Sequence, residues 1–204
     1  MLSAKAEFLR RSQEVEEYLL YLEKLEQQTG ISISLMNTMK SSALLMLYNS
    51  VESTMTGLIQ DLFDHLQTKR IDFDELNSTM RTVVLTYAKR HSPSKLVVKM
   101  DSSSTNLVIA SFERNSIFSG NLDCKEIRET LKTIGIQTKH PYREVALKRV
   151  KDERNDLAHG NKSFSDCGKA CSSKELRDFH SKTTIVLTNA INDFQFFLDN
   201  EDYS

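Results

Sequence analysis

Glycine and proline are scarce in this chain of 204 residues, which contains six glycines and two prolines. A turn-rich β fold uses many of both, so their scarcity favours long helices. Long apolar runs are also missing. The longest one, 43–48 (ALLMLY), is far shorter than the ~20 residues that a membrane-spanning helix needs. We therefore expect a helical protein that does not cross a membrane.

Neither sign of charge dominates, because 27 basic residues face 28 acidic ones and the net charge is −1. No overall field draws the chain onto nucleic acid, so any site for RNA must be local. The three cysteines are an odd number, and residues 1–11 (MLSAKAEFLRR) lack the apolar core of a secretory signal. These features predict a reducing, cytoplasmic location.

A metal set could be assembled from Cys167 and Cys171 with Cys124 or His180. The C-x3-C spacing departs from the usual zinc patterns, however. Phosphate-cradling and dinucleotide glycine motifs are missing as well. We expect free thiols, no metal and no other cofactor.

Apolar residues recur at helical spacing through most of the chain. They predict helices at about 3–29, 37–67, 72–92, 123–135, 140–160 and 172–200. Capping-box spacing supports three of these starts, at Asp72, Asp123 and Ser172. The first half of helix 37–67 is apolar on nearly all sides, which predicts a central helix covered by neighbours or by another protomer.

The expected architecture is one all-α domain, 1–204, built as an antiparallel helical bundle. Two β-branched runs, 95–100 and 106–112, interrupt the helical pattern. They predict either a small β-hairpin or an irregular insertion around 95–112, and the pattern does not choose between the two.

The most informative stretch is 140–160 (HPYREVALKRVKDERNDLAHG). Pro141 suits the first turn of a helix, and Gly160 suits the left-handed position just after its end. One stripe of this helix joins Leu147, Val150, Arg154 and Leu157. Arg154 is therefore placed on the face expected to be buried, where an unpaired guanidinium is costly. It should have either a partner or a chemical task.

A neighbouring stripe joins Lys148, Lys151 or Asp152, Asn155 and His159. At the C-terminal end of a helix the dipole favours a protonated imidazole. An arginine, an amide, a titratable histidine and nearby lysines together could grip a phosphodiester and move a proton. The same residues also fit a structural interpretation, in which Arg154 forms a core ion pair and His159 only caps the helix.

Glu52 is a candidate counter-ion for Arg154. It lies on helix 37–67 between apolar residues and Tyr48. If the pair exists, removing one partner would leave a buried charge, at a cost of about 3–5 kcal/mol. Exposure of Glu52 to solvent is equally compatible with its spacing, and both interpretations stay open.

The segment Arg154 to His159 (RNDLAH) matches an R-x4-H motif with a polar residue after the arginine. Together with 47–53 (LYNSVES), 118–123 (FSGNLD) and 154–164 (RNDLAHGNKSF), it resembles the MAE-type branch of the HEPN superfamily of helical ribonucleases. The resemblance spans most of the chain. Members of this branch occur in bacterial defence and toxin–antitoxin settings.

This resemblance implies a metal-independent endoribonuclease that cleaves single-stranded or looped RNA by attack of the ribose 2′-OH. The implied catalytic residues are Arg154, Asn155 and His159. From their positions in the sequence rather than from the resemblance, we expect supporting roles for Glu52, Asp156 and Tyr48 and phosphate contacts for Lys148, Lys151 and Lys162. A plain loop without such a contact is the alternative for the segment that contains Lys162. The resemblance also implies a homodimer with a composite active site, and a possible antitoxin or other operon-encoded protein partner.

Two alternatives remain from the sequence. One is a catalytically silent HEPN-like module that binds RNA or a protein. The other is a helical scaffold in which Arg154 serves only as a core ion pair.

Overall fold

The computed structural model describes residues 2–103, 106–112, 118, 120–140 and 142–204. The helices in these residues are α1 (Ser3–Glu26), α2 (Ile33–Lys69), α3 (Ser78–Ala88), α4 (Pro93–Ser103), α5 (Leu107–Ser111), α6 (Cys124–Ile134), α7 (Val145–Ala158), α8 (Phe164–Lys169) and α9 (Ser173–Asp199), with a 3-10 turn at Phe73–Glu75. The described residues contain no β-strand. The expected all-α fold is therefore confirmed.

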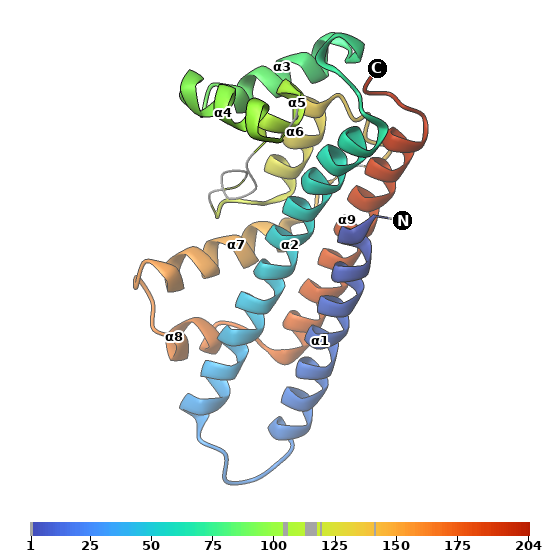
Figure 1. Ribbon diagram of the computed structural model, residues 1–204. Helices are drawn as coiled ribbons and strands as arrows, with labels where there is room; N and C mark the ends of the chain where they lie inside the picture. The colour runs from blue at the N-terminus through green and yellow to red at the C-terminus, as the bar shows by residue number, and fades with distance from the viewer. Residues whose placement is uncertain (1, 104–105, 113–117, 119, 141) are drawn as a thin grey trace.

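Three long helices, α1, α2 and α9, lie side by side and form the body of the molecule (Figure 1). α1 runs antiparallel to the other two. Helices α3, α4 and α5 cover one end of this body, and α7 and α8 lie on one flank of α2. Buried residues occur on several sides of α2, which makes it the central helix. The apolar pattern of 37–67 predicted this position.

The start of α1 is fixed to α2 by a polar contact within the core. The buried carboxylate of Asp61 accepts hydrogen bonds from the Ser3 hydroxyl at 2.5 Å and from the Ala4 N–H at 2.9 Å. The first N–H groups of a helix have no partner inside that helix. A carboxylate on α2 therefore satisfies one of these donors, the Ala4 N–H, in the first turn of α1. Gly57 allows the close approach, because a Cβ there would lie 3.0 Å from the Cβ of Ala4.

Both structures considered for 95–112, a β-hairpin and an irregular insertion, are wrong for the described residues of this segment. The described residues of this segment form α4 and α5, while residues 104–105 lie outside them. Asn106 caps α5 by accepting a hydrogen bond from the Ile109 N–H at 3.3 Å, and Val108 is fully buried. Packing of Val108 in the core outweighs the strand preference of a β-branched run, because that preference depends on context.

Helix starts follow the sequence closely at one predicted capping box and less closely at another. Ser172 and Glu175 form the reciprocal box that opens α9. Asp72 instead opens the short 3-10 turn, and α3 begins at Ser78 after Asn77 accepts from the Met80 N–H at 2.9 Å. Local capping chemistry therefore marked both places where the chain turns, although the longer helix begins a few residues later.

α7 begins at Val145, which shortens the helix expected over 140–160, and Pro141 lies outside the described residues. Just before this start, Tyr142 adopts a positive φ of 32°. Its buried hydroxyl donates to Asp193 of α9 at 2.8 Å. A left-handed tyrosine is costly, so this hydrogen bond and its burial hold the chain in place where α7 begins. α7 then packs against α2, α6, α8 and α9.

Candidate functional site at the end of helix α7

The C-terminal end of α7 presents its histidine to solvent. The His159 N–H bonds to the Asn155 carbonyl at 3.0 Å, and Gly160 follows with a φ of +71°. Gly160 thus takes the left-handed position that the sequence predicted. His159 is exposed, and so are Ala158, Gly160 and Asn161 around it. An imidazole in this position can reach a molecule in solution.

Arg154 lies on the inner side of the same helix end. Its guanidinium carbon is 4.8 Å from the centre of the Tyr48 ring, and Nη1 donates to Oδ1 of Asn155 at 3.0 Å. Gly120 packs directly against the guanidinium, since a Cβ at residue 120 would be 2.6 Å from Nη1 of Arg154. The guanidinium is held between a ring, an amide and a backbone turn, which leaves it partly exposed.

The ion pair considered between Glu52 and Arg154 does not occur within 4 Å in the part of the chain that the structure describes. Glu52 is half-buried and its carboxylate instead faces the Tyr48 hydroxyl. The aromatic face of Tyr48 replaces it as the main neighbour of the guanidinium. A ring face attracts a cation through its quadrupole, by about 0.5–2 kcal/mol depending on desolvation.

Tyr48 supports the site from beneath and does not open to solvent, since only 1 % of it is exposed. Its hydroxyl accepts a hydrogen bond from the Leu122 N–H at 3.2 Å. Burial raises the pKa of Tyr48, and the carboxylate of Glu52 adds to this effect. Tyr48 therefore stays neutral and serves as a fixed surface on which Arg154 rests.

The turn 120–123 completes this corner of the site, and residue-by-residue reasoning on the sequence did not select it. Nδ2 of Asn155 donates to Oδ1 of Asn121 at 3.1 Å. Asp123 caps α6 and pairs with Lys151 of α7 at 2.7 Å. The signal for this turn was the resemblance of segment 118–123, which pointed to the right segment without assigning a role to Gly120, Asn121 or Asp123.

Two of the three lysines expected to bind RNA are engaged within the protein. Lys151 pairs with Asp123, and both side chains are largely buried, with 16 % and 13 % exposed. Lys162 pairs with Glu153 at 3.0 Å and with Asp156 at 2.9 Å. These carboxylates raise the pKa of Lys162 and of Lys151. Lys148, in contrast, is exposed and forms no ion pair among the described residues.

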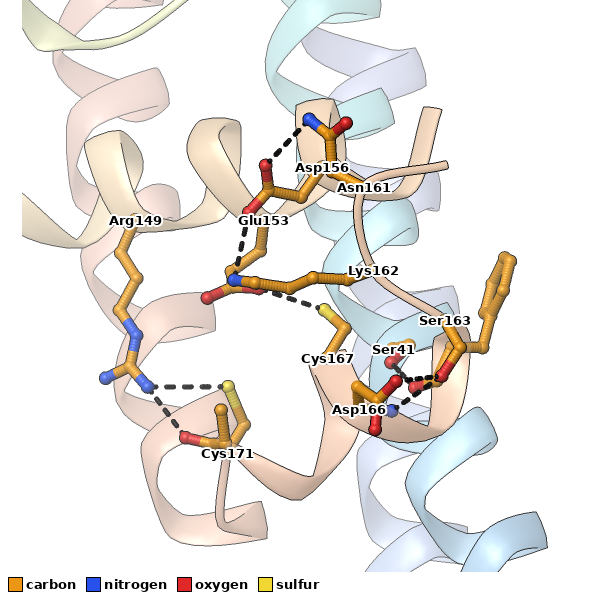
Figure 2. Close-up of polar contacts among 12 residues, drawn as sticks. Ser41, Arg149, Glu153, Asp156, Asn161, Lys162, Ser163, Asp166, Cys167 and Cys171 are labelled. Carbon is orange, nitrogen blue, oxygen red and sulfur yellow. Dashed lines mark hydrogen bonds and ion pairs between the residues drawn. The ribbon is translucent and has the colours of Figure 1, made fainter. Parts of the chain in front are cut away.

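A polar network fixes the segment after His159 to α7 (Figure 2). Lys162 reaches back to Asp156 and Glu153, and the Cys167 thiol donates to the same Glu153 carboxylate at 3.2 Å. Asp156 also accepts from the Asn161 side chain. Both ends of the turn that follows His159 are thus attached to the helix that carries it. Asp156 therefore holds this turn against α7, and its supporting role in a reaction stays a prediction.

Cys167 contacts a carboxylate and Cys171 contacts a guanidinium. Cys171 lies 3.7 Å from Nη2 of Arg149, which also donates to the Ala170 carbonyl at 2.8 Å. Cys124, Cys167 and Cys171 are free and buried. Burial raises the pKa of Cys167 to about 11, and its hydrogen bond to Glu153 contributes. Within the described residues no group of three or more metal-binding side chains gathers in one place.

The chain is an all-α bundle, and the C-terminal end of one helix carries an arginine, an amide and an exposed histidine. Its class is therefore that of helical-bundle proteins with an R-x4-H motif. A family model for the MAE-like HEPN family matches residues 4–203. The match covers nearly the whole chain, so the protein belongs to this family of the HEPN superfamily. No curated protein and no solved structure gives a significant match. Among the helices described, none combines the length and the apolar character needed to cross a bilayer.

Proposed function

We propose that the protein is a metal-independent endoribonuclease that cleaves single-stranded or looped RNA. The observation that carries this proposal is the position of His159. It is exposed at the end of α7, one turn after an Asn155 side chain that is hydrogen-bonded to Arg154. Membership of the HEPN superfamily, in which many domains are ribonucleases, supports the same conclusion.

The proposed reaction is a transesterification within the RNA. The ribose 2′-oxygen attacks the adjacent phosphorus as its proton leaves, and the bond to the 5′-oxygen breaks as that oxygen gains a proton. The products are a 2′,3′-cyclic phosphate and a 5′-hydroxyl. His159 takes part in the proton transfers, which typically contribute about 10²–10⁴-fold to a rate.

Arg154 and Asn155 are proposed to stabilise the charge that develops on the non-bridging phosphate oxygens. A guanidinium suits this task because its planar set of N–H donors matches two oxygens at once. Arg154 is already oriented by Tyr48 and Asn155, so little rotational freedom remains to be lost when RNA binds. Lys148 is the candidate for an additional phosphate contact, since it is exposed and unpaired in the described chain.

One chain offers one motif histidine, whereas the reaction needs two proton transfers. We therefore propose a homodimer in which two His159 side chains face a shared cleft. Mixing wild-type protein with an inactive His159→Ala form tests this arrangement. A composite site predicts that mixed dimers lose activity, whereas independent sites predict activity in proportion to the wild-type subunits present.

We further propose a cytoplasmic effector of a bacterial defence or toxin–antitoxin system, held in check by a protein encoded in the same operon. Co-expression with the product of the neighbouring gene tests this. Inhibition of RNA cleavage by a stable complex is the expected result, and unchanged cleavage in its presence would contradict the proposal.

The decisive experiment is incubation of the purified protein with single-stranded RNA, followed by mapping of the ends. His159→Ala should lower the cleavage rate by about 10²-fold or more and leave folding intact, because the side chain is exposed. His140→Ala is the matched control, as His140 precedes α7 and lies outside the motif. Cleavage should persist in a chelator and should not occur on DNA, which lacks the 2′-OH.

A second candidate function is a catalytically silent HEPN module that binds RNA or a protein. One observation favours the protein-binding form of this alternative: Lys151 and Lys162 are neutralised by carboxylates, which leaves less positive charge to hold a polyanion. An RNA gel shift that is retained in His159→Ala, with no cleavage by the wild type, would support this function over the first.

A further inference from the structure

The side chains of Asn121 and Asn155 form a short relay that ends on Arg154. Nη1 of Arg154 donates to Oδ1 of Asn155, and Nδ2 of Asn155 donates to Oδ1 of Asn121. A guanidinium can only donate hydrogen bonds. Asn155 therefore accepts from Arg154 through its oxygen, and its nitrogen is available to donate to Asn121. Asn121 in turn must offer its oxygen.

The turn that carries Asn121 is fixed on both sides of this residue. Before it, Gly120 is buried against the guanidinium with a φ of +82°. After it, the Leu122 N–H donates to the buried hydroxyl of Tyr48, and Asp123 pairs with Lys151. Asn121 thus has little freedom to move away from α7, and its position is set by neighbours from α2 and α7.

Asn121 itself is exposed, whereas Asn155 is half-buried. An exposed side chain rarely holds one amide in a fixed orientation, because water competes for the hydrogen bond. Here the backbone around it is held by three other contacts, so the hydrogen bond forms without much further loss of chain entropy. The arrangement has the form of a second layer that orients a group acting directly on a ligand.

We infer that Asn121 is a positioning residue of the RNA-cleaving site: it holds the Asn155 amide in the orientation that directs Arg154 to phosphate. The inference rests on the proposed function for its catalytic consequence. It assigns no contact with RNA to Asn121. Its effect is on the turnover rate once RNA is bound, with little effect on the RNA concentration at half-maximal rate.

A double-mutant cycle on RNA cleavage tests this role. Asn121→Ala should lower kcat by about fivefold to tenfold, the scale of one lost hydrogen bond, with KM changed less than twofold. In an Asn155→Ala background the same substitution should have no further effect, because its target is gone. Additive effects of the two substitutions would overturn the inference.

Asn121→Asp provides the rescue. An aspartate keeps an oxygen acceptor for the Asn155 N–H, so kcat should return to within about threefold of the wild type. If Asn121 instead contacted phosphate through its own N–H, the aspartate would be worse than alanine, and KM would rise. That result would contradict a positioning role.

A measurement without RNA separates failure of this inference from failure of the proposed function. The side-chain amide signals of Asn155 in an NMR spectrum should shift and broaden in Asn121→Ala and stay near their wild-type positions in Asn121→Asp. If the wild type cleaves no RNA, the proposed function is wrong, and the NMR result still decides whether Asn121 orients Asn155. Unchanged Asn155 signals in Asn121→Ala would overturn the positioning role whether or not RNA is cleaved.

Discussion

Gly120 and Arg154 lie so close together that a methyl group on residue 120 would sit 2.6 Å from the guanidinium. The glycine is needed here for two reasons, its left-handed φ of +82° and the space that the arginine occupies. Residues 34 positions apart in the sequence thus share one surface of the candidate site.

Gly120→Ala should therefore destabilise the fold and displace Arg154. A left-handed alanine costs about 1–2 kcal/mol, and the displaced guanidinium adds to this. The matched control is Gly30→Ala, since Gly30 has a similar φ of +91° but nothing within 4 Å of the added carbon. Urea denaturation should show the larger loss for Gly120→Ala, and RNA cleavage should fall only in that variant. Equal losses of stability with unchanged cleavage in both would contradict the role of the contact.

Substitution of Lys148 should affect RNA binding, whereas substitution of Lys151 should affect the stability of the fold. Lys148→Ala should weaken RNA binding and lower the salt dependence by about one phosphate contact, with no loss of stability, because this lysine is exposed and unpaired in the described chain. Lys151→Ala should instead lower the free energy of unfolding by about 1–3 kcal/mol, since it leaves the largely buried Asp123 without its charged partner while the backbone N–H donors remain. Filter binding at several salt concentrations and urea denaturation measure the two effects.

The Asp123–Lys151 pair should also make stability depend on pH. Burial opposes ionisation of Asp123, but the hydrogen bond from Lys151 and those from the backbone N–H groups of Glu126 and Lys125 outweigh it, so the pKa of this carboxyl lies below its ordinary value of 3.8. A lowered pKa in the folded state means that the contribution is complete above 3.8 and is lost as the pH falls through the folded value.

Asp123→Asn is the variant that isolates this effect, because asparagine still caps α6 but carries no charge. It should be less stable than the wild type near neutral pH, and the two proteins should converge as the pH falls below 3.8 and through the lower folded pKa. Urea titrations at several pH values provide the comparison. A constant difference down to strongly acidic pH would argue against the ion pair as its source.

The thiols should be nearly inert in the folded protein. Burial raises the pKa of Cys124 and of Cys167 to about 11, so at mildly alkaline pH only about a thousandth of each is thiolate. Labelling with a thiol reagent should be slow in buffer and complete within the mixing time in urea. Rapid labelling in buffer that disappears in a Cys167→Ala variant would show that the packing of α8 against α2 and α7 opens easily.

Much of the fold was predictable because helices are encoded locally. Period, caps and breakers concern residues only a few positions apart, and they predicted α1, α2, α6 and α9 within a few residues. The end of α7 was predicted in the same way, from Gly160 and from the stripe that contains Arg154. The β-branched runs of 95–112 misled, because their helical state depends on burial against other helices.

The catalytic roles of Arg154, Asn155 and His159 stay a prediction, and so do the RNA contact of Lys148 and the dimer. Spacing alone placed these residues on adjoining faces of one helix end. Spacing could not show which lysines are neutralised by ion pairs, because a pair such as Lys151 with Asp123 joins residues 28 positions apart. Two of the three lysines selected for RNA therefore turned out to be paired within the protein.

The sequence by itself determined that this chain forms helices and that one helix ends in an arginine, an amide and a histidine, because such features arise between residues one turn apart. Only the tertiary structure decided what surrounds that arginine. Tyr48 from α2 and Gly120 and Asn121 from a distant turn meet it because the helices pack that way, and close packing depends on the shapes of surfaces that no local pattern specifies.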